Sequence, residues 1–308
     1  MMLKRWWIYQ QERFPIFQHG MLILVFSSAT VFYSALLRDR EPDSRSILIA
    51  FLTLFCFFLQ LRIIDEFKDY DDDRRYRPYR PVPRGLIDLK ELGIVGFLSA
   101  VVQLYLAYSL SIDLAIVLGF VWIYMLLMSQ EFFLRSLLKT RPILYLVSHN
   151  FIIPLICLYG SACDWLVAGE SMPIDVFWLL VASSSTGLVV EIGRKIRAPQ
   201  DEEVGVETYS VLWGRDNAVL VWCFVVLLSS VTSYFAAEQI GFSRPFGFLL
   251  FILGMGVSLI AYVFFNRPTR KGAKLIDIMS GLWTLSIYLS LGVVPFFLHY
   301  EVYRFLAG

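Results

Sequence analysis

Acidic side chains are concentrated at one point of the chain, directly after a long apolar segment. Six carboxylates lie there within nine residues: Asp65, Glu66, Asp69, Asp71, Asp72 and Asp73. If the apolar helix continues, residues 65, 69 and 72 or 73 share one face, and like charges stacked in this way repel unless cations lie among them. Mg²⁺ prefers oxygen ligands and usually binds one or two carboxylates together with substrate phosphates. The spacing therefore predicts a Mg²⁺ site formed by Asp65, Asp69 and either Asp72 or Asp73.

Cationic side chains accompany the acidic run. Those placed to hold the phosphates of a substrate are Lys68, Arg77, Arg80 and Arg84. Guanidinium groups suit this role because their planar array of N–H donors matches phosphate oxygens. The alternative interpretation is a solvated, charged loop beside a membrane, since cytoplasmic loops are often basic. That alternative accounts for the arginines but not for six acids that follow an apolar helix.

The composition is that of an integral membrane protein. Of the 308 residues, 57% are hydrophobic and 16% are aromatic, and the mean hydropathy is +0.63. Several windows of about 20 residues are nearly free of charge, which is the length that crosses the hydrocarbon core of a bilayer. Many apolar segments follow the first, so the first is a span and not a removable signal peptide. We expect one integral-membrane domain over residues 1–308, with membrane lipid and no nucleic acid among its partners.

Nine helices form the skeleton that must position these side chains. They are predicted at residues 20–37, 46–65, 91–111, 113–134, 142–162, 173–195, 216–237, 245–265 and 275–299. Strands are not expected, because the apolar runs are too long and do not alternate. Pro154 and Pro295 lie inside predicted spans and are expected to kink them. The predicted fold class is all-α, a polytopic membrane bundle of nine transmembrane helices.

The distribution of basic residues predicts the orientation of the bundle. With the N-terminus in the cytoplasm, the cytoplasmic side receives 21 of the 27 lysines and arginines, and the other side receives five. Arg62 lies within a span. Because cytoplasmic loops carry the excess of basic residues, we expect the N-terminus and both charged loops in the cytoplasm and the C-terminus on the opposite side.

A second charged stretch follows the sixth predicted span, from Glu191 to Gly214. Together with the acidic run, it resembles the UbiA-type superfamily of intramembrane prenyltransferases. The first motif of that family, Asn-Asp-x-x-Asp-x-x-x-Asp, is similar to Asp65-Glu66-x-x-Asp69-x-x-x-Asp73, and its Arg-Pro-(Leu/Val)-x-x-Gly tail is similar to Arg80-Pro81-Val82-Pro83-Arg84-Gly85. The later part of the second motif, Asp-x-x-x-Asp followed by Gly and Thr, is matched by Asp201, Gly205, Thr208 and Gly214. Nine spans is also the helix count of the family, so the resemblance covers essentially the whole chain.

The chain departs from the family pattern in both motifs. Asp65 and Glu66 stand where the family has Asn and Asp, which adds charge and length. Arg197 stands where the second motif has its first Asp. A metal at the second motif would therefore lose a ligand, and the substitutes are Glu191, Glu202, Glu203 or a phosphate oxygen. Arg197 could itself contact phosphate, which keeps diphosphate chemistry within reach of the altered motif.

The resemblance implies a reaction and a set of roles. A prenyl diphosphate would ionise at C1 with the help of Mg²⁺, and the prenyl group would pass to an aromatic or other lipophilic acceptor. The catalytic residues implied are Asp65, Glu66, Asp69, Asp73 and Asp201. The metal ligands implied are Asp65, Asp69, Asp73, Glu191 and Asp201. The substrate-binding residues implied are Lys68, Arg77, Arg80, Arg84, Lys195, Arg197 and Asn150.

Polar groups inside the predicted spans leave two interpretations open. His149 and Asn150 could orient the acceptor or take a proton, or they could form a hydrogen bond between helices. Glu131 and Arg135 are four residues apart, which favours a simple ion pair on one helix.

Two other functions compete with prenyl transfer. In a UbiA-type terpene cyclase, a double bond of the substrate itself would capture the cation, and the same ionising site would serve. In a cation transporter, the acids would form a translocation site, although the adjacent arginines oppose a cation path.

Overall fold

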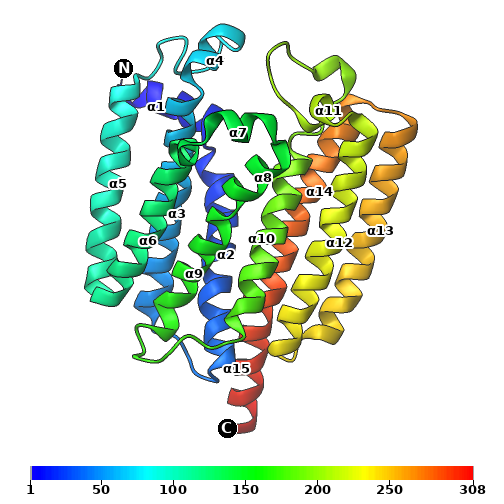
Figure 1. The fold of residues 1–308 in the computed structure, drawn as a ribbon. Helices are drawn as coiled ribbons and strands as arrows, with labels where there is room; N and C mark the ends of the chain where they lie inside the picture. The colour runs from blue at the N-terminus through cyan, green and yellow to red at the C-terminus, as the bar shows by residue number, and fades with distance from the viewer. Residues whose placement is uncertain (1, 308) are drawn as a thin grey trace. The chain divides into compact units, whose positions relative to one another are not determined.

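The computed structural model describes residues 2–307, with the side chains of residues 3–300, and this part of the chain is helical without strands. Nine helices within it are long and apolar enough to cross a membrane. They are α2 (Ile16–Leu37), α3 (Ser44–Lys68), α5 (Leu89–Leu110), α6 (Ile112–Ser129), α8 (Pro142–Asn150) continued by α9 (Ile152–Trp165), α10 (Val176–Gly193), α12 (Arg215–Gln239), α13 (Ser243–Asn266), and α14 (Arg270–Tyr288) continued through Leu289–Val293 into α15 (Val294–Ala307) (Figure 1). The prediction of an all-α membrane bundle with nine spans is confirmed.

The helices form two compact units. The first holds the residues up to Val31 and Pro42–Ser171, and the second holds Phe32–Glu41 and the residues from Met172 on. A single domain over residues 1–308 stays a prediction.

In the first unit, α3 packs against α5, α6 and α9 (Figure 1). Buried amides join these helices: Gln60 donates to Ser99 at 3.0 Å and to Gln103 at 2.6 Å, and Gln103 donates to the Thr53 carbonyl at 2.9 Å. Polar groups in apolar surroundings need such partners, so these bonds fix the helices to one another at defined heights.

In the second unit, α10 packs against α12 and α14 through small polar residues (Figure 1). Ser185 bonds Thr232 at 2.7 Å, and Thr186 bonds Ser229 at 3.0 Å. Gly193 lies so close to α14 that a Cβ there would stand 2.0 Å from the Ser280 hydroxyl oxygen. The C-terminal end of α10, from which the second charged loop leaves, is therefore tightly held.

Short helices and breaks lie between the spans. They are α1 (Met2–Arg13), α4 (Tyr70–Tyr76), η1 (Glu131–Phe133), α7 (Arg135–Thr140), η2 (Pro199–Asp201) and α11 (Tyr209–Leu212). The fifth span is interrupted at Phe151, three residues before Pro154, and the ninth becomes a π-helix just before Pro295. Both prolines lack the N–H that would continue the α-helical ladder, which accounts for the interruptions.

The fourth span ends earlier than predicted. α6 stops at Ser129 and not at residue 134, because Glu131, Phe132 and Phe133 adopt φ values of 50°, 53° and 58°. Three consecutive residues other than glycine in the left-handed region cannot continue a right-handed helix. The chain therefore turns at Glu131 before α7 begins.

Candidate active site

The acidic run keeps helical spacing across the joint between α3 and α4. The Asp69 amide donates to the Asp65 carbonyl at 2.9 Å, and the Asp73 amide donates to the Asp69 carbonyl at 2.8 Å. Asp65, Asp69 and Asp73 therefore follow one another at intervals of four, as the sequence predicts. Even so, no three Asp, Glu, His or Cys side chains among the described residues are grouped closely enough to hold a metal ion.

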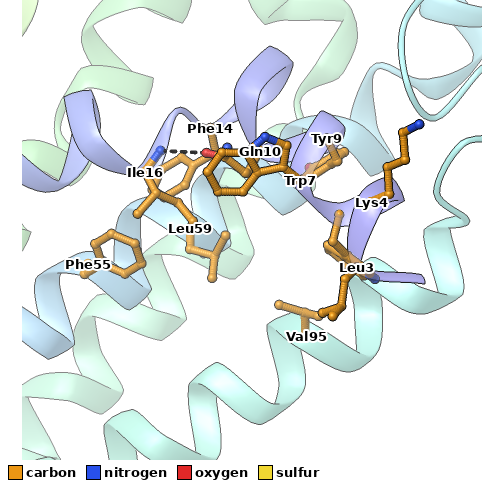
Figure 2. A pocket seen from close by; sticks show the side chains of 11 residues that line it. Leu3, Lys4, Trp7, Tyr9, Gln10, Phe14, Ile16, Phe55, Leu59 and Val95 are labelled. Carbon is orange, nitrogen blue, oxygen red and sulfur yellow. Dashed lines mark hydrogen bonds between the residues drawn. The ribbon is translucent and has the colours of Figure 1, made fainter. Parts of the chain in front are cut away.

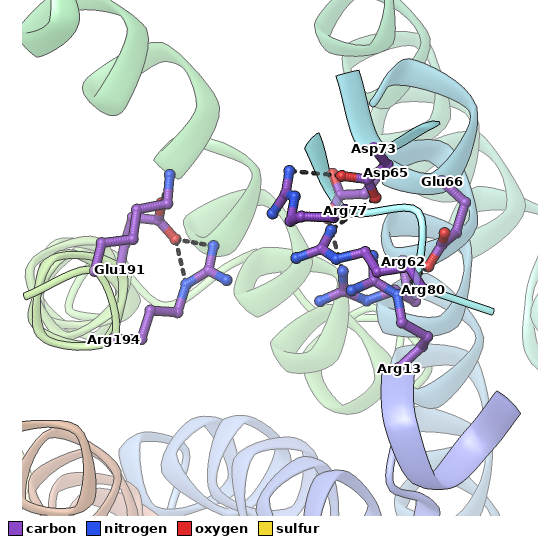
Figure 3. A network of polar contacts seen from close by, with 10 residues as sticks. Arg13, Arg62, Asp65, Glu66, Asp73, Arg77, Arg80, Glu191 and Arg194 are labelled. Atoms are coloured by element: carbon purple, nitrogen blue, oxygen red, sulfur yellow. Dashed lines mark hydrogen bonds and ion pairs between the residues drawn. The ribbon is translucent and has the colours of Figure 1, made fainter. Parts of the chain in front are cut away.

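The acids of this run are paired with arginines from several elements (Figure 3). The buried Asp73 carboxylate lies 2.6 Å from the Arg77 guanidinium and 2.7 Å from that of Arg80. The buried Glu66 pairs with Arg13 at the end of α1. These contacts place two of the predicted phosphate-binding arginines, Arg77 and Arg80, directly at the acidic run.

Asp69 differs from its neighbours. Desolvation raises the pKa of Asp69 above its usual range, and the charges of Asp65 and Asp73 raise it further. The positive charges of Lys68 and Arg77 oppose this rise only in part. Within the part of the chain that the structure describes, no cation forms an ion pair with the Asp69 carboxylate. The negative charge of the ionised Asp69 is therefore only partly balanced by nearby positive charge, and a bound cation would stabilise it.

The other two predicted phosphate-binding cations of this region point elsewhere. Arg84 pairs with Glu12 of α1 at 2.8 Å and donates to the Tyr79 carbonyl at 2.7 Å. Lys68 reaches Tyr145 of α8 at 2.6 Å. The structure therefore brings Arg77 and Arg80 to the acids and turns Arg84 and Lys68 toward other partners.

The loop after α4 is fastened by an apolar cluster. Val82, from the Arg-Pro-Val-Pro-Arg-Gly stretch, is buried with Tyr9, Ile63, Ile87 and Leu92. This cluster joins α1, α3 and α5 directly beneath the acidic run. Sequence reasoning did not assign α1 a role, although its aromatic residues between Trp6 and Tyr9 lie outside any span and are a signal for an interfacial helix.

An apolar pocket of about 620 Å³ lies between α1, α3 and α5 (Figure 2). Its lining residues are Leu3, Lys4, Trp6, Trp7, Tyr9, Gln10, Phe14, Ile16, Phe55, Leu59 and Val95. Of the residues predicted to act on substrate or metal, none belongs to this lining. The walls suit hydrocarbon, and Lys4 is the charged residue among the lining residues.

The second charged loop, in the second unit, neutralises its own charges. Glu191 pairs with Arg194 (Figure 3) and with Lys195 at 2.9 Å. Asp201 accepts a hydrogen bond of 2.6 Å from Arg270 of α14. Both acids that were predicted as metal ligands here therefore already have cations beside them.

Arg197, which stands in the place of an acid of the family motif, joins the two ends of this loop. Its guanidinium lies 3.1 Å from Glu203 and donates to the Asp201 carbonyl at 3.3 Å. Its backbone amide donates to the Ser210 hydroxyl at 2.8 Å. Lys195 lies 5.3 Å from the centre of the Tyr209 ring. The loop is organised around cations as much as around acids.

The polar residues of the fifth span divide between two environments. Asn150 is buried at the end of α8. His149 approaches Lys68, with 3.1 Å between the ring Nε2 and the ammonium nitrogen. Glu131 is also part of this group, 3.3 Å from Lys68. Glu131 also lies 3.7 Å from Arg135, so the expected ion pair is present. The two residues do not lie on one helix, because the left-handed break separates them.

Known proteins resemble this chain in sequence and in fold. The model of the UbiA prenyltransferase family matches residues 24–285. A digeranylgeranylglyceryl phosphate synthase from Thermococcus sibiricus is 22% identical over 234 residues, which cover 75% of this chain and 78% of that protein. The apo structure of a UbiA homologue from Aeropyrum pernix K1 has a TM-score of 0.64 at 14% identity, over 84% of this chain and 96% of the other.

The structure of a UbiA homologue from Archaeoglobus fulgidus, bound to DMAPP and Mg²⁺, has a TM-score of 0.56 at 11% identity, over 92% of this chain and 98% of the other. At these identities the solved structures show the fold alone. The family match covers most of the chain, and it includes both charged stretches from which the resemblance was drawn. This chain belongs to the UbiA prenyltransferase family.

Proposed function

We propose that this protein ionises a prenyl diphosphate with the help of Mg²⁺ and transfers the prenyl group to a lipophilic acceptor. The observation that carries the proposal is the acidic run at the end of α3. There, the half-buried Asp69 has no ion pair among the described residues, while Arg77 and Arg80 converge on Asp73 four residues further on. A metal diphosphate requires a carboxylate that can bind the metal and arginines that can bind the phosphates, and both lie here.

The residues of the run fit Mg²⁺ under one condition. Their donors are carboxylate oxygens, but no three of them are grouped as a site among the described residues. Mg²⁺ commonly takes one or two carboxylates and completes its shell with water and substrate phosphate. Asp69, with Asp65 or Asp73, would hold the ion in this way, and the homologue from Archaeoglobus fulgidus, solved with DMAPP and Mg²⁺, supports the assignment. Bound there, Mg²⁺ would neutralise charge on the leaving group.

The arginines supply the remaining stabilisation. As the bond between C1 and oxygen breaks, its electron pair leaves with the diphosphate, and negative charge grows on the phosphate oxygens. Arg77 and Arg80, held in place by Asp73, can donate to those oxygens. The allylic cation then forms a bond to the acceptor, which loses a proton. Glu66 forms an ion pair with Arg13, and we assign it the role of holding the acidic run in place.

For the second charged loop, we propose that cations replace part of the family's metal chemistry. Lys195 and Arg197 would contact the diphosphate, and Asp201 and Glu191 would hold those cations or a weaker second metal. The ion pairs of Glu191 with Lys195 and of Arg197 with Glu203 support the view that the acids of this loop hold its cations in place.

The acceptor belongs to the lipophilic class, aromatic or otherwise. The name of the relative from Thermococcus sibiricus describes a product built on glyceryl phosphate, so an alcohol is a candidate beside a phenol. A terpene cyclase is the second candidate function, because the second motif is altered at Arg197. A cation transporter is disfavoured by membership of the prenyltransferase family.

One experiment separates these functions. Purified protein in lipid vesicles is given C10, C15 and C20 prenyl diphosphates with Mg²⁺ or EDTA, with and without a total lipid extract of the native membranes. Transfer predicts Mg²⁺-dependent diphosphate release and a prenylated lipid that mass spectrometry detects only with the extract. A cyclised hydrocarbon formed without extract would identify a cyclase, and no diphosphate release with any donor would refute the proposal.

We also propose that the N-terminus and both charged loops are cytoplasmic and that the C-terminus lies on the opposite side, as the lysine and arginine count indicates. Cysteines introduced at Arg75 and at Gln200 should be protected from an impermeant thiol reagent in intact cells, and one at Ser44 should react. Labelling of the first two before permeabilisation would reverse the orientation.

A further inference from the structure

A polar cluster in the first unit has no part in the ionisation proposed above. Lys68, at the end of α3, lies 2.6 Å from the Tyr145 hydroxyl, 3.1 Å from His149 Nε2 and 3.3 Å from Glu131 Oε1. These side chains come from α3, η1 and α8, and Glu131 is buried. Lys68 lies within the acidic run, between Glu66 and Asp69, so the cluster adjoins that run.

The backbone at Glu131 is held in an uncommon conformation. Glu131, Phe132 and Phe133 have φ values between 50° and 58°, and none of them is a glycine. Such residues persist only where their surroundings determine the backbone, and they gather at functional sites. Here the turn ends α6, and the Glu131 carboxylate meets Lys68 instead of continuing along a helix face.

The two carboxylate oxygens of Glu131 have different surroundings. Oε1 faces Lys68, whereas Oε2 is buried and accepts no hydrogen bond from any described residue. The cation nearest to Oε2 in the ion pairs of this region is Arg135, at 3.7 Å, and its side chain is 65% exposed. A buried carboxylate oxygen without a donor is costly, so this geometry calls for a ligand that donates a hydrogen bond.

Aromatic rings lie beside the cluster. Phe132 is 5.4 Å from Tyr124 and 6.1 Å from His149, and Tyr145 stacks on His149 at 3.9 Å between ring centres. These rings give the cluster apolar surroundings, and Glu131 Oε2 is a buried polar atom there that receives no hydrogen bond from a described residue. A hydroxyl group on a hydrophobic body fits both features.

We propose that Glu131 Oε2 is the proton acceptor for a hydroxyl-bearing substrate, an alcohol or a phenol. This inference rests on the proposed function, because it names the group that receives the proton of the acceptor. The C1–O bond of the donor breaks, and its electron pair leaves with the diphosphate. A lone pair of the acceptor oxygen forms the new bond to C1, the O–H proton passes to Glu131, and the product is an ether. Lys68 positions the carboxylate, and Tyr145 and His149 hold Lys68 in place.

The test compares Glu131→Gln with the wild-type protein in vesicles. The probes are radiolabelled C20 prenyl diphosphate, Mg²⁺ and the total lipid extract of the native membranes. The variant should lower formation of the prenylated lipid by ~10² to 10⁴-fold, the usual range for loss of a general base. Diphosphate release and donor KM should stay within about twofold of the wild type, because ionisation does not use Glu131.

Glu91→Gln is the matched control, because Glu91 is an ion-paired glutamate of the same unit, 2.6 Å from Arg5. It should change neither readout. If Glu131→Gln does not fold, Glu131→Asp replaces it, since this variant keeps the charge but withdraws the oxygens by one methylene. A selective loss of the prenylated lipid supports the proposal in either variant. Equal loss of both readouts, no loss of either, or a wild-type protein that forms no prenylated lipid overturns it. A wild-type protein that releases no diphosphate refutes the proposed function instead.

Discussion

The two charged regions differ in how their acids are compensated. In the first unit, Asp73 pairs with two arginines, whereas the nearby half-buried Asp69 has no ion-pair partner among the described residues. In the second unit, Glu191 and Asp201 each have a cation within hydrogen-bonding distance. Because an acid that already holds a cation gains less from a metal than one that holds none, we expect a metal to bind at the acidic run rather than at the second loop.

We expect the largest loss of activity from a substitution at Asp69, and this variant tests the comparison most directly. Asp69→Ala should lower Mg²⁺-dependent turnover by ~10²-fold or more, the scale of losing one electrostatic contact to a transition state. Asp65→Ala and Asp73→Ala should act in the same direction. Asp72→Ala is the control, because Asp72 is exposed in the same run. Diphosphate release at saturating Mg²⁺ is the measurement. A triple variant with wild-type turnover, or full activity in EDTA, would show that the run has no metal role.

The second unit can be perturbed through its packing without changing a charge. At Gly193, two residues after Glu191, an added methyl group would stand 2.0 Å from the Ser280 hydroxyl and 3.0 Å from Trp222 Nε1. Gly193→Ala should therefore destabilise the protein by about 1–3 kcal/mol, as overpacking does. Thermal unfolding in detergent measures this. Gly281→Ala is the control, since no atom lies within 4 Å of its added Cβ, and a lower midpoint for both variants would contradict the packing explanation.

The sequence predicts the spans and the interruptions near Pro154 and Pro295, but it does not predict the break after α6. Nine runs of apolar residues fix nine helices because their length matches the bilayer. The left-handed turn at Glu131, Phe132 and Phe133 has no such signal, since these residue types do not favour positive φ. It arises from tertiary contacts such as that between Glu131 and Lys68. The short helix α1 was missed because it is too brief and too polar to be read as a span.

The helical spacing of the acidic run was predictable from the sequence, whereas the pairings of its side chains were not. The spacing of Asp65, Asp69 and Asp73 is local, so helical geometry alone gives it. Lys68 was assigned to phosphate by its position in the run, yet it contacts Tyr145, 77 residues away. Such partners depend on which helices are neighbours, and one sequence does not contain that information in any local pattern.

Arg197 tests whether the second loop depends on its cation. Arg197→Asp restores the acid of the family motif, so the motif alone predicts that activity is kept or improved. We expect about a tenfold loss of activity with weaker donor binding, because a carboxylate would then stand beside Glu203 in place of the guanidinium that pairs with it. Arg215→Asp is the control, since Arg215 pairs only with its chain neighbour Asp216 among the described residues. Unchanged KM and turnover across a Mg²⁺ titration would exclude a loop built around a cation.

The smallest expected effect is at Lys195, and it distinguishes substrate binding from membrane anchoring. The Lys195 ammonium lies 2.9 Å from Glu191 and near the Tyr209 ring, with about a third of the side chain exposed. A partly exposed ammonium group on a flexible stem is expected to contribute mainly to binding of the donor, so its removal should appear more in KM than in kcat. Lys195→Ala should raise the donor KM about three- to tenfold with kcat nearly unchanged.

Lys274→Ala provides the matched comparison for Lys195. Lys274 forms an exposed pair with Asp277 at 2.7 Å on α14 of the same unit, and it has no assigned contact with substrate. If lysines of this region merely anchor helices at lipid headgroups, the two variants should behave alike, with unchanged KM and small equal losses of stability. If Lys195 contacts the diphosphate, only its variant should raise KM, and the rise should shrink at high ionic strength because screening weakens the exposed charge. A KM that is the same for both variants at every salt concentration would leave the second loop without a role in donor binding.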